Sequence, residues 1–548
     1  MNESKELIGK KTKTKTQILK ENLQLKVKIN KTYTTRRQIR NKYISIAICA
    51  CTFIIICIFF YTKLSKNKKP IKKIKISKEE EKEEKETENI EKKVPKIEEI
   101  YKEIESYETN FTKEECNELD PINIFKQRLN TNATLVCQNG LSKHICYKDS
   151  NPIFVASNGV FCEFNDIILD PSKWRGDGNT YKGPMDPSNR GCPLLDKGFF
   201  NIKCKEGKMT EYKGYDFIYN NYFNGWDYQY DNYEKEKEDL EELAEGKTVF
   251  FISRNQDSPN LYHGGSEFVN ALAIMYLLNL DPENIQVVFL ESILIYDDPF
   301  YDLYKNLIGR AGDPIHVRNL TKKYKVSNGI HVPIGWDSPC FIHSNPPECS
   351  NNPTKTYYLY NKLIDIFMTP INYVDSFQSN EENFYYPESI LNLNKKKNKF
   401  DKIVTFQWRR VWPKGRSGQQ RILGNGPELA DKLSKILPKN ILLRLIDTAS
   451  LPISEQIAIM RKTDYFVGIH GAGLSLSIYS PPNCIYHEVL HASNMDGLHL
   501  FAALSGHKVY KDIISANVKD VDGNENIFFN VEEFAHKVLE HMKESNFI

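Results

Sequence analysis

The sequence predicts an α/β protein made of two Rossmann-like units that face a cleft, preceded by a transmembrane helix and a stem. Strand-like apolar runs alternate with helical patterns over residues 246–395, and the alternation resumes over residues 396–548. Such alternation is typical of parallel sheets whose strands are joined by crossover helices. A polar segment over residues 376–400 separates the two series, so we place a linker there. An almost wholly apolar run from Ile44 to Tyr61 precedes both units and indicates the membrane segment.

The N-terminal part is predicted to be a basic cytosolic tail over residues 1–43 and a transmembrane signal anchor over residues 44–62. The apolar run is long enough to span a bilayer as a helix. A cleaved signal peptide would have a shorter apolar core, a closer N-terminus and a small-residue cleavage site, and none of these is seen. Lysines and arginines flank both sides, so the positive-inside rule does not set the orientation.

Residues 63–112 are rich in lysine and glutamate and cannot bury a core, so we expect a stem that is disordered or a solvated helix. Isoleucine and valine recur at helical spacing within it, which leaves a weak coiled-coil contact open. These positions are Ile90, Val94, Ile97, Ile100 and Ile104.

Residues 113–245 form a Cys-rich region that we expect to pack on the units that follow. Nine of the 12 cysteines lie beyond the apolar run, and six of these crowd into residues 116–204, as in a disulfide-stapled region of an oxidising lumen. A zinc framework is less favoured because no C-x-x-C pair is present. The pairing cannot be read from the sequence; Cys340 and Cys349 could close a local loop, and Cys484 is expected to be a buried free thiol.

Three sequons follow the predicted anchor and also suit a lumenal location for the remainder of the chain. They are Asn110, Asn132 and Asn319. The formal net charge of +3 is close to zero, so the composition does not indicate a nucleic-acid partner.

The first unit is predicted to contain strands at 249–252, 287–290 and 330–334, and helices at 268–280, 300–308 and 357–371. The second unit is predicted to contain strands at 403–406, 441–443, 465–468 and 485–489, and helices at 427–437, 453–462, 496–505 and 531–543.

The most informative stretch is the glycine-rich turn within residues 467–474, Val-Gly-Ile-His-Gly-Ala-Gly-Leu. An apolar strand leads into it, and a helix can open after it. Glycines allow the backbone to turn sharply and approach a ligand closely. A strand, a glycine turn and a helix N-terminus together suit a phosphate. We therefore predict a nucleotide or nucleotide-sugar site that includes His470, Gly471, Ala472, Gly473 and Leu474.

An esterase is a specific rival, because His-Gly-Ala-Gly is close to the oxyanion-hole loop of that class. That interpretation requires a G-x-S-x-G nucleophile elbow, and the sequence contains none. We therefore set the esterase aside.

Other side chains are expected to complete the donor site. Arg409 and Arg410 follow a strand, and at least one is expected to hold a diphosphate, because arginine stays charged and grips phosphate with two N–H groups. Glu488 lies on the strand after the glycine turn, where a carboxylate can accept hydrogen bonds from ribose hydroxyls. Arg416 and Arg421, in a glycine-rich loop, could close over the donor.

A sugar transfer also needs a base for the acceptor hydroxyl, and we expect it from the first unit. The candidates are His263, Glu267 and Asp297. His263 and Glu267 are four residues apart, so they share a face if a helix has begun there.

Several of these motifs resemble glycosyltransferase family 61, over roughly residues 245–515. The similarity in the second unit lies in Ser454-Glu455-Gln456, Asp464-Tyr465-Phe466-Val467-Gly468, His470-Gly471-Ala472-Gly473-Leu474, and Pro481-Pro482 leading to His487-Glu488-Val489. Arg409-Arg410, and Asn260-Leu261-Tyr262-His263 in the first unit, are similar to further elements of the family. The sequence departs from the family at Gly264-Gly265-Ser266-Glu267, where bulky apolar residues are frequent.

The resemblance implies a GT-B-like fold and a type II membrane protein of the Golgi or endoplasmic reticulum. It implies an inverting glycosyltransferase that moves N-acetylglucosamine, xylose or another pentose from a UDP-sugar to a protein or glycan acceptor. Enzymes with this fold usually work without a metal, so we expect no metal ion in catalysis.

Two alternatives remain at this level. One keeps the fold without catalysis, as an inactive lumenal protein that binds nucleotide sugars or glycans. The other is a membrane-tethered structural protein organised by its stem.

Overall fold

The computed structural model describes residues 95–107, 119–131, 133–140, 142–147, 161–175, 194–205, 222–253, 260–290, 300–332, 352–368, 384–385, 400–410, 421–492 and 499–548. They all fall within one compact unit, Val94–Ile548. The predicted tail and anchor lie outside the described residues. Within these ranges, the helices are all too short or too polar to cross a membrane.

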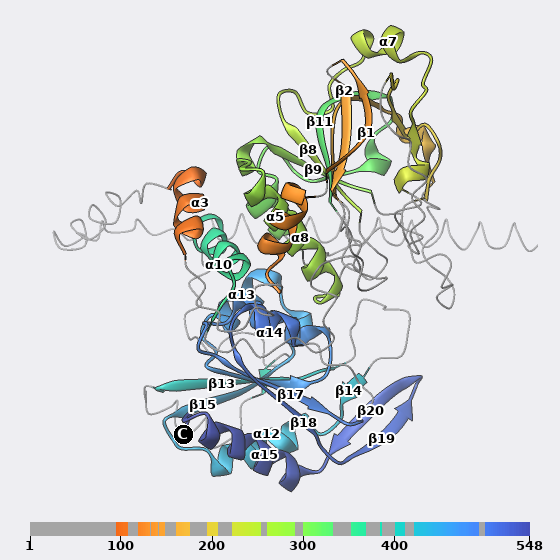
Figure 1. The fold of residues 1–548 in the computed structure, drawn as a ribbon. Coiled ribbons are helices and arrows are strands. Elements are labelled where there is room, and N and C mark those ends of the chain that lie inside the picture. The colour runs from red at the N-terminus through yellow and green to blue at the C-terminus, as the bar shows by residue number, and fades with distance from the viewer. Residues whose placement is uncertain are drawn as a thin grey trace, which may run out of the picture. The chain divides into compact units, whose positions relative to one another are not determined.

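A nine-stranded sheet forms the first half of this unit (Figure 1), with the strand order β1-β2-β3-β11-β8-β9-β10 and two short strands beside β3. Four neighbouring strands, β11, β8, β9 and β10, pair parallel. Among the strands from the Cys-rich region, β1, β2 and β3 pair antiparallel, as β3 does with β11 and β6, whereas β6 and β7 pair parallel with each other. The parallel strands β8 and β9 are apolar and buried along nearly their whole length, because both faces of a parallel sheet are covered. The bounds are β1 Ala133–Asn139, β2 Ser142–Tyr147, β3 Phe161–Leu169, β6 Phe200–Asn201, β7 Trp226–Asp227, β8 Thr248–Ile252, β9 Ile285–Phe289, β10 Ile315–His316 and β11 Tyr324–Val332.

Helices of the first half are α5 Pro121–Thr131, α8 His263–Leu277, the short α9 Tyr301–Leu303 with a π-helical turn Tyr304–Ile308, and α10 Lys355–Phe367. The helix α8 is buried from Gly264 to Met275, so it is a core element covered on all sides. It follows β8 and precedes β9, as a crossover helix must.

A six-stranded sheet forms the second half, with the order β12-β15-β13-β16-β17-β18. All neighbours are parallel except β12, which pairs antiparallel with β15. Its strands are β12 Phe384–Tyr385, β13 Lys402–Gln407, β15 Ile441–Ile446, β16 Tyr465–Ile469, β17 Ile485–Leu490 and β18 Lys508–Ile513. A small sheet of β14 Arg421–Leu423, β20 Asn524–Phe529 and β19 Ala516–Val521 lies beside it.

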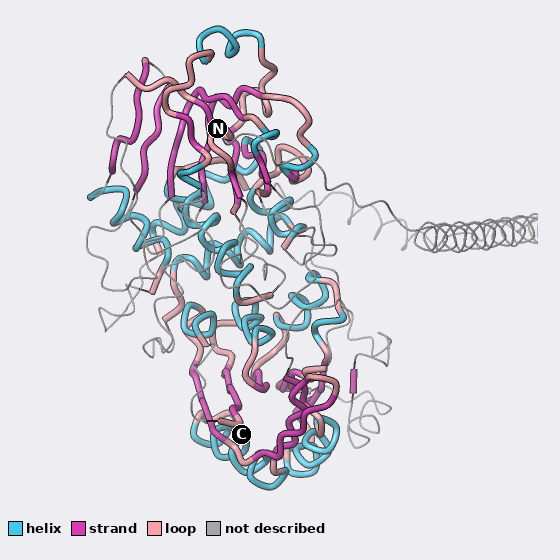
Figure 2. The backbone as a smooth tube through the Cα atoms, turned by 90° about the vertical axis from the view of Figure 1, so that its right-hand side faces the viewer, coloured by secondary structure: helices cyan, strands magenta, loops and turns pink. Residues whose placement is uncertain are grey.

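Helices cover both faces of the six-stranded sheet (Figure 2). One face packs on α12 Gly426–Ile436 and α15 Val531–Glu544, whose apolar residues share a core with the strands. The other face packs on α13 Ile453–Met460, the 3-10 helix η9 Ala472–Tyr479 and α14 Leu500–Leu504. That second core continues without a break into residues of α8 and α10, so helices of the two halves pack directly on one another.

The α/β fold class predicted from the sequence is confirmed, and every predicted strand and helix has a counterpart at nearly its predicted place. The largest shifts are in β11, which begins at Tyr324 rather than at residue 330, and in α8, which begins at His263 rather than at residue 268. The segment after the glycine turn is a 3-10 helix. The sequence pattern missed β18, β19 and β20, and it missed β12, which lies inside the predicted linker.

The prediction of a solvated stem is wrong for its C-terminal part. Residues Ile97–Ser106 form α3, and one face of this helix is buried against the core that contains α10. The hydroxyl of Tyr101 donates to the backbone oxygen of Leu280, 2.8 Å away. The helical spacing of isoleucines therefore marks a docked helix, because four apolar side chains on one face need a partner surface.

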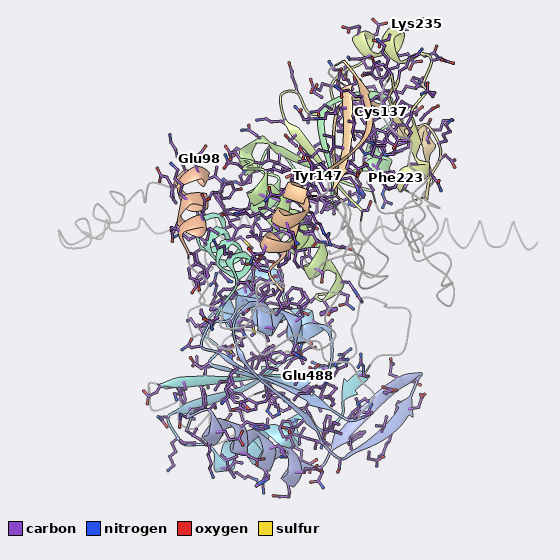
Figure 3. The ribbon with its side chains drawn as sticks, in the orientation of Figure 1. Glu98, Cys137, Tyr147, Phe223, Lys235 and Glu488 are labelled. Carbon is purple, nitrogen blue, oxygen red and sulfur yellow. A yellow bond between two sulfur atoms is a disulfide. The ribbon has the colours of Figure 1, made fainter. Side chains whose placement is uncertain are left out.

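Two disulfides confirm the expected stapling of the Cys-rich region: Cys137–Cys204 and Cys146–Cys162. Figure 3 labels Cys137 on β1. Cys484 is a buried free thiol, as predicted. Cys340 and Cys349 lie outside the described residues.

Candidate functional site

The candidate site lies where the parallel strands of the six-stranded sheet end. From β13 the chain passes to β15 on one side and later to β16 on the other side, so the strand order reverses between β13 and β16. In open α/β sheets, ligands bind beyond the carboxyl ends of strands at such a switch point. The residues that follow these two strands are Trp408, Arg409 and Arg410 after β13, and His470 and Gly471 after β16.

Two glycines allow the turn after β16 to press against side chains from β13. A Cβ atom added at Gly471 would lie 1.2 Å from Nη1 of Arg409, and one added at Gly473 would lie 1.6 Å from Nε2 of Gln407. Either side chain would collide with the neighbouring group. A larger residue at either position would therefore force Arg409 or Gln407 to move from its place beside the turn.

Arg409 links the two strand ends. Its Nη1 donates a hydrogen bond to the backbone oxygen of His470 over 2.8 Å. One N–H group of the Arg409 guanidinium is thereby bound to the turn, and this bond holds the planar guanidinium beside the glycines. A cation fixed at this edge suits an anionic ligand.

A carboxylate orients the imidazole of the turn. Nδ1 of His470 lies 2.6 Å from Oε1 of Glu488, and Nδ1 of His499 lies 3.6 Å from Oε2 of the same carboxylate. The side chain of Glu488, labelled in Figure 3, is fully buried, whereas 9% of the His470 side chain is exposed. Since a carboxylate accepts the Nδ1 proton, Nε2 is the ring atom left for a ligand.

This arrangement differs from the ribose contact expected for Glu488. Both of its oxygens face histidines, and none of its side-chain surface is exposed. Glu488 is placed to position His470 instead.

Arg410 has a more exposed position than Arg409. Its side chain is 43% exposed, and Nη1 lies 3.9 Å from Oδ2 of Asp447, at the end of β15. Burial raises the pKa of Asp447, and the guanidinium of Arg410 opposes that shift. Arg421 begins β14, while Arg416 lies outside the described residues.

The remaining predicted turn residues have different surroundings. Ala472 and Gly473 are partly exposed at the start of η9. The first N–H groups of a helix have no partner within that helix, which suits an anion. Leu474 is fully buried, and its amide donates to the oxygen of Gly471 over 2.9 Å, so it anchors the turn from within.

Two of the candidate bases lie at the start of α8. His263 is its first residue and partly buried, and Glu267 lies one turn further on and is fully buried. This end of α8 packs on α14: the rings of Tyr262 and Phe501 are 5.8 Å apart, and a Cβ atom at Gly265 would lie 3.1 Å from Phe501. The glycine here, which departs from the family pattern, thus makes room for Phe501. Asp297 lies outside the described residues.

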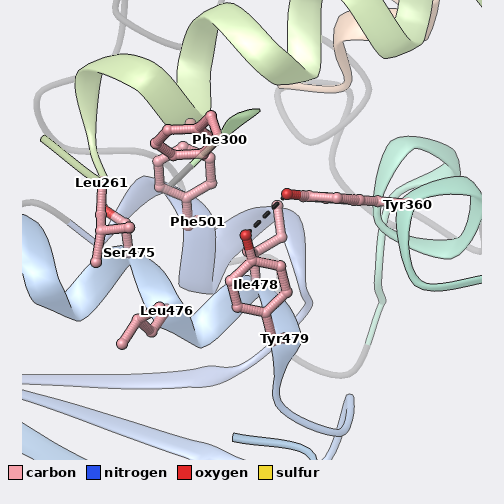
Figure 4. A pocket seen from close by; sticks show the side chains of 9 residues that line it. Leu261, Phe300, Tyr360, Ser475, Leu476, Ile478, Tyr479 and Phe501 are labelled. Carbon is pink, nitrogen blue, oxygen red and sulfur yellow. Dashed lines mark hydrogen bonds between the residues drawn. The ribbon is translucent and has the colours of Figure 1, made fainter. Parts of the chain in front are cut away.

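A small pocket lies between the start of α8 and the helix η9 (Figure 4). Its walls are mostly apolar, and at one side the hydroxyls of Tyr360 and Tyr479 are 2.8 Å apart. Such a lining offers little to a phosphate, so we do not assign the donor to it. The lining residues are Leu261, Gly265, Phe300, Tyr360, Ser475, Leu476, Ile478, Tyr479 and Phe501.

The sequence reasoning missed some residues of the site. Gln407, Asp447 and His499 contact the predicted residues, but no motif marks them. At the matching edge of the nine-stranded sheet, the hydroxyl of Ser253 lies 2.9 Å from Nε2 of His331, which was assigned only to a strand. Gln407, Asp447 and Ser253 share one signal in the sequence, a polar residue at or directly after the end of an apolar strand.

Of the predicted sequons, Asn319 is exposed on the surface. Asn110 and Asn132 lie outside the described residues.

Comparison with known proteins gives one family. Residues 262–486 match the family model described as Glycosyltransferase 61. The matched segment runs from the residue before α8 into β17, so it includes Arg409, His470 and the glycine turn. Among curated proteins, none matches the chain. The resemblance found in the sequence is confirmed by this match to glycosyltransferase family 61 over residues 262–486.

Proposed function

We propose that the protein is an inverting glycosyltransferase of the secretory pathway that transfers a sugar from a UDP-sugar donor to a protein or glycan acceptor. It would be a single-pass type II protein of the Golgi or endoplasmic reticulum membrane, with a lumenal catalytic part of the GT-B type. The donor sugar would be N-acetylglucosamine, xylose or another pentose. The family match supports glycosyl transfer in general.

One observation carries the donor assignment: Arg409 and the His470–Glu488 pair meet at the switch point of a parallel sheet. The UDP leaving group gains negative charge as the glycosidic bond to it breaks. Groups already oriented toward that charge stabilise the transition state because they need no rearrangement. We assign this role to Arg409, His470 and the first amides of η9, with Arg410 as a further cation at the rim.

Inversion requires the acceptor oxygen to attack the anomeric carbon from the face opposite to UDP. The new C–O bond forms as the old one breaks, and the acceptor proton passes to a base. We propose His263 as the first candidate, because it is partly exposed at the end of α8 that approaches α14. Glu267 is fully buried and is a weaker candidate, and Asp297 is the third. We propose that the reaction proceeds without a metal ion.

A second candidate function is a lumenal protein that binds a nucleotide sugar without transferring it. The complete burial of Glu267 favours it, since a base must reach the acceptor hydroxyl.

The test is thermal unfolding of the full chain in detergent, with and without UDP. A ligand that binds only the native state at about 100 times its Kd stabilises it by about 2.7 kcal/mol, so the midpoint should rise. Arg409→Lys keeps the charge but loses the planar fork, and we expect UDP to bind about tenfold more weakly. Arg461→Ala is the matched control, because that arginine binds Asp365 and the oxygen of Asn361 instead.

Hydrolysis of UDP-sugars by the same preparations separates the two functions. A UDP-dependent rise with slow release of UDP from one sugar supports the transferase. A rise without turnover of any UDP-sugar, with acceptor peptides or glycans present, supports the binding protein. No rise at millimolar UDP would overturn the donor assignment.

A further inference from the structure

Two histidines and an aspartate meet on the face of the six-stranded sheet opposite to Glu488. His487 lies on β17, Asp512 on β18 and His541 near the end of α15. Successive side chains of a strand point to opposite faces, so His487 faces α15 while Glu488 faces the donor site. The rings of His487 and His541 are 5.0 Å apart. This cluster is therefore separate from the donor site, although the same strand contributes to both.

The cluster converges on one oxygen atom. Nε2 of His487 lies 2.9 Å from Oδ2 of Asp512, and Nε2 of His541 lies 2.6 Å from the same oxygen. The three possible ligand atoms are all within 4.8 Å of one another. The side chain of His487 is fully buried, and those of His541 and Asp512 are only 12% and 14% exposed.

These distances are close to those of a zinc site. Ligand atoms about 2.1 Å from a tetrahedral zinc ion are about 3.4 Å apart. If the carboxylate of Asp512 moved by less than about 1 Å, the three ligand atoms would therefore have the spacing of a tetrahedral zinc site. Little rearrangement of the backbone is needed.

The second nitrogen of each imidazole already has an oxygen partner. Nδ1 of His487 lies 2.9 Å from the hydroxyl of Tyr465, and Nδ1 of His541 lies 3.1 Å from Oε2 of Glu544. The ring of Tyr510 stacks on His541 at 4.0 Å and fixes its plane. Histidines that bind a metal through one nitrogen usually donate from the other to a carboxylate or similar oxygen. Both imidazoles here are oriented in that way.

The donor set selects the type of ion. Two imidazole nitrogens and one carboxylate oxygen suit zinc, whereas magnesium and calcium prefer oxygen ligands throughout. Among the described residues, one other histidine cluster has metal-like spacing, but its cysteines, Cys146 and Cys162, are joined in a disulfide.

We propose that His487, Asp512 and His541 bind a zinc ion that fastens the last helix, α15, to β17 and β18. The competing arrangement is a hydrogen-bonded network in which Asp512 accepts one hydrogen bond from each imidazole. The second neighbour of His541 is the carboxylate of Glu544 in either arrangement. The zinc proposal does not depend on the transferase activity, since no catalytic residue belongs to the cluster.

The experiment uses the full chain in detergent, freed of metal with a chelator, dialysed against zinc chloride and then against buffer. We expect about one zinc per chain by elemental analysis, with a thermal midpoint that zinc raises and a chelator lowers. Cobalt(II) in place of zinc should give the visible absorption bands of a tetrahedral site.

Asp512→Asn keeps the size of the side chain and its capacity for a hydrogen bond, so it should fold. We expect it to bind zinc at least about 100-fold more weakly, and to lose the cobalt bands. His536→Gln is the matched control, because His536 is exposed on the same helix. It should retain the metal and the response to the chelator.

Two results would overturn the proposal. One is a wild-type chain that keeps no more zinc than Asp512→Asn, with a midpoint that zinc does not move; the cluster is then a hydrogen-bonded network. The other is equal, stoichiometric zinc in wild type and in Asp512→Asn, which would place the ion elsewhere.

Discussion

Buried imidazoles occur in both sheets, but their partners differ. In the nine-stranded sheet, His144 lies among aromatic side chains: it stacks on Trp226 at 4.1 Å, and Nδ1 lies 3.2 Å from the hydroxyl of Tyr228. In the six-stranded sheet, His470 and His487 each face a carboxylate. Burial lowers the pKa of His144 to about 3, and the nearby His331 adds to the shift. An imidazole without an acidic partner thus stays neutral and serves packing.

The comparison separates two uses of one side chain. In the nine-stranded sheet, where disulfides and aromatic rings fill the interior, the histidine is a packed core residue. Where a carboxylate fixes one ring nitrogen, the other nitrogen is held in a defined direction for a ligand. The partner of a histidine is therefore a better guide to function than its burial.

The largest effect is expected from removing the carboxylate partner of His470 in the proposed donor site. Glu488→Gln keeps the shape but removes the charge, so His470 loses its orientation. By analogy with other histidine–carboxylate pairs, kcat/KM for the UDP-sugar should fall by about 10³ to 10⁴. Steady-state kinetics would measure it, with Glu532→Gln as an exposed control on α15. If kcat/KM falls by less than tenfold in a variant whose thermal midpoint is unchanged, the His470–Glu488 pair has no part in sugar transfer.

A smaller effect is expected from the aromatic cluster, and it concerns stability. The pKa of His144 is near 6.5 in the unfolded chain, whereas burial lowers the pKa to about 3 in the folded protein. Neutral, buried His144 therefore contributes fully to the free energy of unfolding above pH 6.5. As the pH falls toward 3, this contribution is lost, which lowers the free energy of unfolding by up to about 4 kcal/mol. His144→Gln should therefore lose less stability than wild type between pH 7 and pH 4. Urea unfolding followed by tryptophan fluorescence, to which the stacked Trp226 contributes, would measure the difference; equal losses would contradict the assignment.

The smallest effect is expected at His499. Its Nδ1 is 3.6 Å from Glu488, too long for a strong hydrogen bond. His499→Gln should lower kcat/KM by less than about tenfold, which corresponds to less than about 1.4 kcal/mol. If this variant is as defective as Glu488→Gln, the carboxylate is shared equally by both histidines, and His499 belongs to the same functional unit.

Local patterns in the sequence predicted much of this structure. The alternation of apolar runs located the strands, and the glycine turn marked the right edge of the second sheet. Arg409 and His470 were both identified, but their contact depends on β13 and β16 being neighbours, and strand order is a long-range property. The burial of Glu488 was missed for a similar reason, because it depends on which helices cover that face.

Other features left no local signal. Asp512 and His541 belong to a strand and a helix with no shared motif, and only the packing of α15 brings them together. The strands after residue 507 are partly exposed and polar, so their pattern is not apolar enough to be recognised.

The docked helix α3 affects where the chain can be cut without damage to the folded unit. Its buried face, with Ile97, Ile100, Tyr101 and Ile104, belongs to the same core as the helices of the two halves. A protease that left this unit intact would have to cut on the N-terminal side of Pro95. Cleavage a few residues later would leave an apolar groove on the released protein. A shortened chain that keeps the folded unit therefore has to begin before α3.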